Sequence, residues 1–231
     1  MTAHRSVLAG IAAMALAAGV LNSVAAPAVA DGYIDCNRGN GVCGPDDDTH
    51  YWCFGDSVNS DNLRMSYRWS VSNMEDRTIM NGLQTANCHA YTDVRFQSID
   101  LPPYMGGRYN CTRWAGEDHP AVCAAASVSL DLDEIQRAGN DPSVLGSDGT
   151  IEAGEFDLNR DVVACHEFGH SLGLFHHDFD YFQDNPTDCM INPWIEPERD
   201  GPWRRYNEHH SDHINNFIRG TTQFGMPPGE L

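Results

Sequence analysis

Histidine and glutamate residues between positions 166 and 176 are spaced as a metal ion and a water-activating base require. His166 and His170 are four residues apart, so on a helix they lie on one face and can bind one ion. Glu167 lies beside them, close enough to reach a water molecule at the metal without being a ligand. Gly173 can adopt a positive φ and end the helix, and the chain can then return with His176 as a third ligand. Three protein ligands leave a coordination position open, which is typical of a catalytic zinc site.

The length of this pattern makes coincidence a poor explanation. The core HExxH arises by chance in roughly 3% of chains of this size, and adding Gly173 and His176 lowers that to below about one in 10,000. The alternative is a buried helix that happens to carry histidines, but burying Glu167 there without a metal would be costly. His177 competes with His176 for the third position, although the spacing from Gly173 favours His176. Ligation by histidine without thiolate suits zinc, and other divalent metals also accept it.

The pattern HExxHxxGxxH resembles the signature of the metzincin clan of zinc proteases, which continues into a turn containing methionine. Met190, in Cys189-Met190-Ile191-Asn192, follows His176 by fourteen residues. The resemblance covers roughly residues 64–220 and is closest to matrixin-like bacterial secreted proteases. It implies an α+β fold: a disulfide-stapled domain with a mixed twisted sheet, an active-site helix, and a C-terminal helix near Ser211-Asp212-His213-Ile214. It also implies that Met190 forms an apolar floor beneath the metal and is not a ligand.

The same resemblance implies further features of the site. Cys165 precedes His166 and Cys189 precedes Met190, so we predict a Cys165–Cys189 disulfide that holds the helix to the methionine turn. Asn192 stands where astacin-like and serralysin-like members place a tyrosine, so we expect no fifth ligand. No long propeptide precedes the domain, which argues against a cysteine-switch latency. Two N-terminal cysteines could act as such a switch, but disulfide pairing is the simpler interpretation for both of them: Cys36 and Cys43.

The implied activity is a zinc-dependent endopeptidase acting on protein or peptide substrates. Zinc lowers the pKa of water toward about 7, and Glu167 accepts the proton as general base and passes it to the leaving amine. Two alternatives stay open: a catalytically inactive, protease-like binding module, and a zinc amidase acting on a non-peptide substrate. The intact Glu167 and the full ligand set argue against the first. Residues Ile191–Arg205 would shape the S1′ pocket, but they predict no substrate preference.

The elements that must position these residues are indicated by hydrophobic periodicity. Alternation over Arg64–Val71 predicts a strand, and Ser72 with Glu75 predicts a capping box that opens a helix bearing Ile79, Leu83 and Ala86. Further predicted elements are strands over Thr92–Ile99 and Ser127–Leu132, a helix from about Asn159 to Leu172, and irregular segments over Pro102–Pro120 and Gly139–Gly154. The resemblance makes the strand at Ser127–Leu132 the rim that pairs with an extended substrate.

The first thirty residues have the anatomy of a secretory signal peptide. Met1–Arg5 carries one positive charge, Val7–Leu21 is a small-apolar run, and Ala28-Val29-Ala30 supplies a cleavage site. The fifteen apolar residues are fewer than the roughly 20 that span a bilayer. We therefore expect a secreted, extracellular protein with three segments: a signal peptide (1–30), a cysteine-containing N-terminal extension with little regular structure (31–62), and a metzincin-like catalytic domain (63–231).

Composition limits the partners and the compartment. All eight cysteines follow the predicted cleavage site, and an even number in an exported protein predicts four disulfides. The net charge of −19 argues against binding nucleic acid or anionic membranes. We expect a monomer that binds only its peptide substrates.

Two other groups of metal-ligand residue types are weaker candidates. Asp148-Gly149-Thr150-Ile151 and Glu155 match the second half of a calcium-binding EF-hand loop, but Val144 and Gly146 break the first half. Calcium therefore stays possible but unassigned. The other group is a histidine pair four residues apart, which lacks a third ligand and is interpreted as packing or surface residues rather than a second metal site: His209 and His213.

Overall fold

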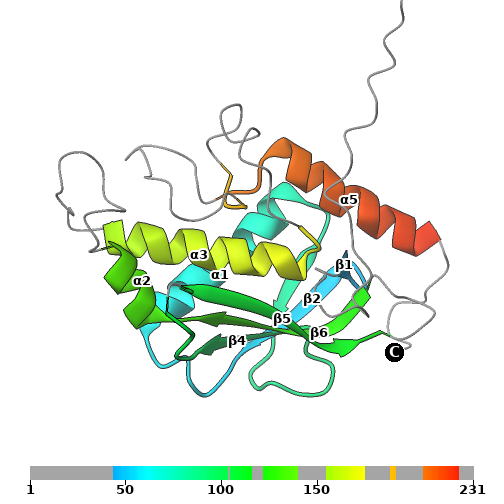
Figure 1. Ribbon diagram of the computed structural model, residues 1–231. Coiled ribbons are helices and arrows are strands. Elements are labelled where there is room, and N and C mark those ends of the chain that lie inside the picture. The colour runs from blue at the N-terminus through cyan, green and yellow to red at the C-terminus, as the bar shows by residue number, and fades with distance from the viewer. Residues whose placement is uncertain are drawn as a thin grey trace, which may run out of the picture.

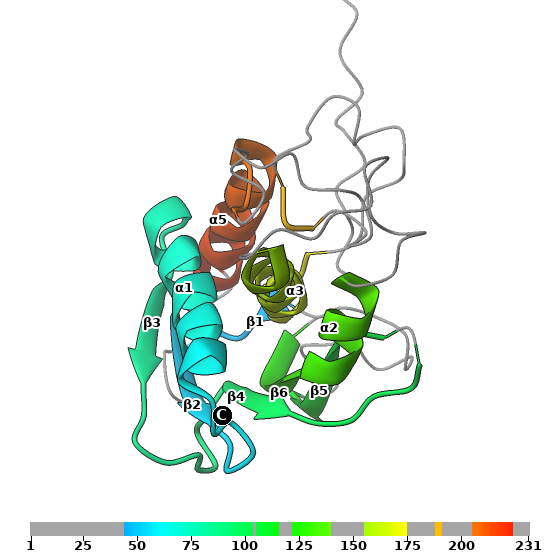
Figure 2. The same cartoon turned by 90° about the vertical axis from the view of Figure 1, so that its left-hand side faces the viewer.

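A six-stranded sheet carries helices on one of its faces in the computed structural model (Figures 1 and 2). The structure describes residues 44–103, 105–115, 122–139, 155–174, 188–190 and 205–223. In chain order the elements are β1 (Gly44–Pro45), β2 (Thr49–Phe54), α1 (Asp61–Arg77), β3 (Asn81–Gln84), β4 (Val94–Ser98), β5 (Gly107–Trp114), β6 (Val122–Leu130), α2 (Leu132–Gly139), α3 (Glu155–Ser171) and α5 (Glu208–Gln223). The mixed sheet, the helix that carries the histidines and the C-terminal helix are as predicted.

The strand order is β1-β6-β4-β2-β3, with β5 paired to β6. Every pair is parallel except β5 with β6, which is antiparallel. Val128 of β6 is opposite Phe96 of β4 and also opposite Tyr109 of β5, so both edges of β6 are occupied. The prediction that Ser127–Leu132 forms the rim is therefore wrong. Among the described strands, β5 pairs with β6 over most of its length, and no strand pairs along the other edge of β5.

The segment predicted as a strand over Arg64–Val71 is helical and belongs to α1. Its N-cap is Ser60, whose side chain accepts a hydrogen bond from the backbone N–H of Leu63. The buried face of α1 includes small polar residues beside apolar ones: Leu63, Ser66, Tyr67, Ser70, Val71, Asn73 and Met74. Serine and asparagine hid the helical period, while the chance alternation of large side chains imitated a strand. Met65, one of the alternating apolar residues, is 56% exposed.

Other boundaries also differ from the prediction. Ser72 and Glu75 do not cap a helix because they lie inside α1, and the helix expected after them is replaced by β3. The segment Pro102–Pro120, expected to be irregular, contains β5, and the N-terminal extension contains β2, which lies between β3 and β4 in the sheet. The strand predicted at Thr92–Ile99 is confirmed as β4, and the predicted histidine helix is confirmed as α3, which begins earlier, at Glu155. Residues 140–154, with most of the EF-hand half-match, lie outside the described residues.

A stack of aromatic rings joins α1, the sheet and α3. The rings of Tyr67 and Phe96 stack with centroids 4.2 Å apart, and Phe96 lies 5.6 Å from Phe168 of α3. All three side chains are fully buried. Burying an aromatic side chain of this size stabilises a fold by about 1.5–3 kcal/mol. The stack therefore holds α3 against the sheet at Phe168, which lies between His166 and His170 in the sequence.

Three disulfides reinforce this arrangement, and they fit a protein that folds in an oxidising, extracellular compartment. They join Cys53 to Cys88, Cys111 to Cys123, and Cys165 to Cys189. The predicted pairing of Cys165 with Cys189 is thus present in the structure. The other two cysteines lie outside the described residues: Cys36 and Cys43. Among the helices that the structure describes, none is long and apolar enough to cross a bilayer.

Candidate metal centre

The histidines and the glutamate of the motif lie on the buried part of α3. His166, Glu167 and His170 are 3%, 9% and 8% exposed. The imidazole centroids of His166 and His170 are 4.8 Å apart, and the ring planes are nearly perpendicular. The helix therefore brings the two rings together as their spacing of four predicted. His176 lies outside the described residues, and within those residues no three metal-ligand side chains converge.

Each of the two imidazole rings is held by a hydrogen bond through its Nδ1 atom. Nδ1 of His166 lies 2.9 Å from the carbonyl oxygen of Cys189, and Nδ1 of His170 lies 2.7 Å from that of Leu174. A carbonyl oxygen can only accept a hydrogen bond, so each Nδ1 carries a proton, and in the neutral imidazole Nε2 then has the lone pair. Metal-binding histidines are typically held in this way by the ring nitrogen that does not face the ion. The donor chemistry of the site therefore fits a zinc ion.

The end of α3 supplies one of these carbonyls. Gly173 has φ of 86°, which confirms the predicted left-handed conformation. The N–H of Leu174 donates to the carbonyl of Gly169, and the N–H of Gly173 donates to that of His170, which together form a Schellman motif. The reversal of the chain aims the Leu174 carbonyl back at the His170 ring. Gly173 thus ends the helix and orients the second histidine.

The side chain of Glu167, which belongs to α3, lies against the first residue of β5, Gly107. Burial raises the pKa of Glu167 to about 7, and a hydrogen bond from the backbone of Tyr109 opposes the shift. A β-carbon at Gly107 would lie 2.5 Å from Cγ and 2.8 Å from Oε1 of Glu167. Only a glycine therefore lets the β5 backbone approach the glutamate so closely. Gly107 and the Tyr109 amide were not identified from the sequence, where they lie in a segment expected to be irregular.

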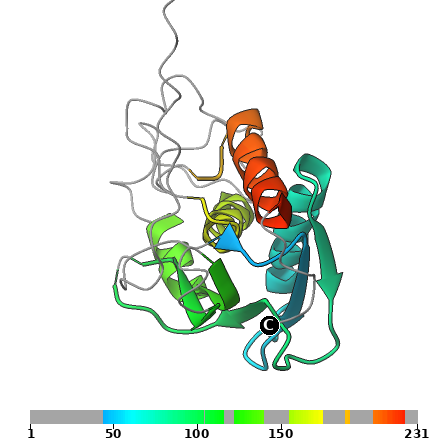
Figure 3. The ribbon, with the colours of Figure 1, turned by 90° about the vertical axis from the view of Figure 1, so that its right-hand side faces the viewer.

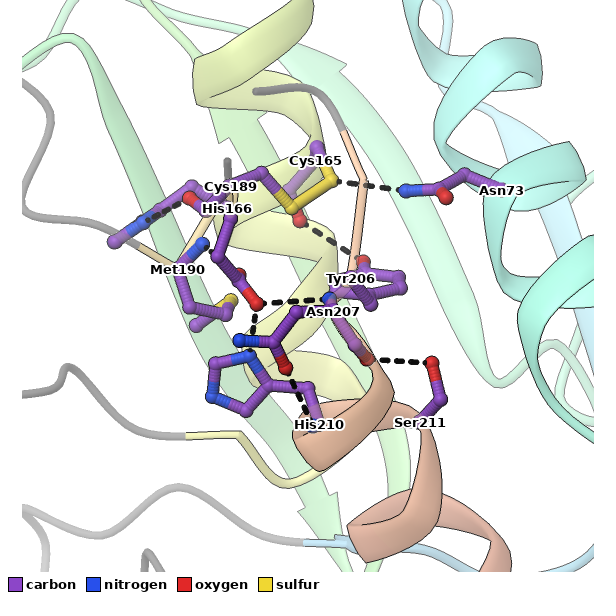
Figure 4. A network of polar contacts seen from close by, with 10 residues as sticks. Asn73, Cys165, His166, Cys189, Met190, Tyr206, Asn207, His210 and Ser211 are labelled. Atoms are coloured by element: carbon purple, nitrogen blue, oxygen red, sulfur yellow. Dashed lines mark hydrogen bonds and ion pairs between the residues drawn. A yellow bond between two sulfur atoms is a disulfide. The ribbon is translucent and has the colours of Figure 1, made fainter. Parts of the chain in front are cut away.

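Met190 is fully buried against α3 (Figure 4). A β-carbon at Gly169 would collide with Sδ of Met190 and would lie 3.1 Å from Cε1 of Tyr206. The missing side chain at Gly169 is what lets the methionine turn pack on the helix between His166 and His170. The role of Met190 as a floor beneath a metal stays a prediction.

A polar network connects the methionine turn to the start of α5, where Asn207 and His210 lie (Figure 4), and it was not identified from the sequence. The carboxylate of Asp188 contacts His210, which lies 22 positions further along the chain. No local pattern marks such a pair, although His210 is next to the His209–His213 pair that the sequence singled out. The rings of His209 and His213 are 4.8 Å apart on α5. Within the described residues no third metal-ligand side chain joins them.

Comparisons with known proteins leave the family open. No family model matches the chain, and no curated protein matches it. Among the solved structures that match is that of myroilysin, which superposes with a TM-score of 0.40 at 9% sequence identity, covering 77% of this chain and 95% of that one. A likeness at this level identifies neither a family nor an activity.

Proposed function

We propose that the protein is a secreted zinc endopeptidase of the metzincin type, with His166, His170 and His176 as metal ligands and Glu167 as general base. The observation that carries the proposal is the pair of adjacent imidazoles on α3, each oriented by a hydrogen bond from Nδ1 to a backbone carbonyl, as metal-binding histidines typically are. His176 completes the ligand set by the spacing HExxHxxGxxH. The signal peptide over residues 1–30 accounts for secretion, and the three disulfides support it.

The chain's own residues account for the movement of protons. When bound, zinc supplies Lewis acidity that makes water a nucleophile and polarises the scissile carbonyl. Glu167 accepts a proton from the attacking water as the new carbon–oxygen bond forms. It then gives that proton to the leaving nitrogen as the carbon–nitrogen bond breaks. The Tyr109 amide and the bare backbone at Gly107 hold the carboxylate in place for both transfers.

The position of β5 favours an extended peptide over a small amide as the substrate. No described strand pairs along the outer edge of β5, and Gly107 at its start lies against Glu167. An extended peptide that added a strand there would pass directly beside the general base. We therefore assign the role of the substrate-pairing strand, which was predicted for Ser127–Leu132, to β5.

Substitutions on α3 test the proposal. Glu167→Ala should keep bound zinc and lower kcat for casein by about 10²–10⁴-fold, since it removes the proton acceptor. His170→Ala should lose both zinc and turnover because it removes a ligand. The measurements are casein hydrolysis with and without 1,10-phenanthroline, and zinc content by atomic absorption. Asp76→Ala, which removes an exposed carboxylate on α1, is the matched control and should match the wild type.

The outcomes separate the alternatives. Near-native activity in Glu167→Ala would overturn the assignment of the base. Hydrolysis of small amides without hydrolysis of casein would favour the zinc amidase. A folded, zinc-loaded protein that cleaves neither would favour the binding module.

A further inference from the structure

The carboxylate of Asp188 binds two separate segments of the chain, one at Met190 and the other at Asn207 and His210. Oδ1 accepts the backbone N–H of Met190 at 2.8 Å. Oδ2 accepts the backbone N–H of Asn207 at 2.9 Å and lies 2.5 Å from Nδ1 of His210. Asp188 is 2% exposed and His210 is fully buried. A carboxylate buried this deeply is costly unless its oxygens are bonded, and here three donors bond them.

These donors join the methionine turn to the start of α5. Oδ1 of Asn207 accepts the backbone N–H of His210, so Asn207 caps α5 while its own N–H binds Asp188. A backbone bond from Cys189 to the carbonyl of Arg205 runs alongside. In Figures 1 and 3, α5 lies above α3, on the side away from most of the sheet. The pair Asp188–His210 therefore fastens the turn to a helix that is itself packed into the core.

The turn carries the carbonyl that orients His166. Cys189 stands between Asp188 and Met190, and the Asp188 carboxylate accepts the backbone N–H of Met190, so it closes the turn around Cys189. The carbonyl of Cys189 accepts the bond from Nδ1 of His166 at 2.9 Å. The disulfide from Cys189 to Cys165 links the same turn to α3 on the other side. Any rotation of the turn would move the acceptor that determines the direction of the His166 ring.

We propose that Asp188 and His210 are positioning residues for His166, acting through the Cys189 carbonyl and not through contact with metal or substrate. This inference rests on the proposed metal centre. Losing an outer hydrogen bond of this kind weakens metal binding by about 10–100-fold in metalloproteins. A role confined to fold stability would instead lower the free energy of unfolding and leave metal affinity unchanged.

Two substitutions at one position separate these roles. His210→Leu removes the donor to Asp188, whereas His210→Asn places an amide Nδ2 where the imidazole has Nδ1. We expect zinc affinity, measured by competition with a chromophoric chelator, to fall about 10–100-fold in His210→Leu and to be largely retained in His210→Asn. The visible spectrum of the cobalt-substituted protein should change in His210→Leu only. Ile218→Ala, a buried substitution two turns along α5, is the control that lowers stability without touching the network.

Unchanged zinc affinity and an unchanged cobalt spectrum in a folded His210→Leu protein would overturn the positioning role. If that variant does not fold, His210→Gln moves the amide away from Asp188 and takes its place in the comparison. A wild-type protein that binds zinc but cleaves no peptide would contradict the endopeptidase and leave this comparison intact. A wild-type protein without zinc affinity would contradict the metal centre and this inference together.

Discussion

Gly107 and Gly169 show how single residues without side chains position the candidate site. At the start of β5, Gly107 lets the backbone approach Glu167, where a β-carbon would meet Cγ of the glutamate and Cγ1 of Val163 at 2.7 Å. On α3, Gly169 leaves the space that Met190 fills. Both glycines are required by close approach between elements and not by their own backbone angles.

Gly107→Ala should reduce catalysis while preserving zinc. The added methyl group must displace Glu167 or the strand, and a misplacement of about 1 Å can lower kcat roughly 100-fold. The measurements are kcat for casein and zinc content. Gly220→Ala is the matched control because a β-carbon there meets nothing within 4 Å. Equal kcat in the two variants would show that Glu167 tolerates the shift.

At the scale of elements, the end of α3 decides the direction of His170. The Schellman motif at Gly173 directs the Leu174 carbonyl to Nδ1 of His170. The end of a helix usually affects stability alone, but the end of α3 also determines the orientation of the His170 ring. The same principle applies at the start of α5, where Asn207 and His210 bind the methionine turn through Asp188.

Substitutions at Gly173 should therefore follow a graded order. Asparagine tolerates a positive φ better than alanine, for which the left-handed conformation costs about 1–2 kcal/mol. We expect both the free energy of unfolding in urea and the zinc affinity to decrease from wild type to Gly173→Asn to Gly173→Ala. If Gly173→Ala were as stable as the wild type, a side chain at position 173 would not strain the turn.

At the scale of the whole molecule, some of the many acidic residues are buried or partly buried. Asp93, before β4, is only 8% exposed, and burial together with the charge of Asp46 raises its pKa to about 8. Burial and the neighbouring Asp47 raise the pKa of Asp46 to about 6. These carboxyl groups lie where β1 meets the sheet. Because their pKa values are raised, folding favours their protonated forms.

Stability should therefore decrease as the pH rises from about 4 to 8. In this window the folded protein retains protons on Asp93 and Asp46 that the unfolded chain, with a pKa of 3.8 for each, has released. Asp93→Asn should raise the free energy of unfolding at pH 8 by about 1–3 kcal/mol and flatten the pH dependence. Its amide oxygen can still accept the N–H of Tyr51, which Asp93 binds at 2.7 Å.

The measurement is urea unfolding at pH 5 and pH 8. Asp48→Asn, which neutralises an exposed neighbour, is the control and should retain the slope of the wild type. If Asp93→Asn showed that same slope, the raised pKa of Asp93 would not contribute to stability.

The sequence by itself determined the features whose contacts are local. The spacing of His166 and His170 placed them on one helical face with Glu167 beside them, and Gly173 marked the end of that helix, because both features depend on residues within two turns of each other. The mixed sheet was also predicted. The helix α1 was not, since its buried face contains serine and asparagine whose partners lie on α3, as in the bond from Ser66 to Asp161.

Only the tertiary structure decided what holds those local features in place. The Cys189 carbonyl reaches His166 across 23 positions, and Asp188 reaches His210 across 22. Gly107 meets Glu167 only because the start of β5 packs against α3. Contacts between distant segments depend on how helices pack on the sheet, and packing reflects the shapes and charges of many residues together. A spacing of residue types can therefore indicate a metal centre, but the elements that orient it become visible only when they have folded against one another.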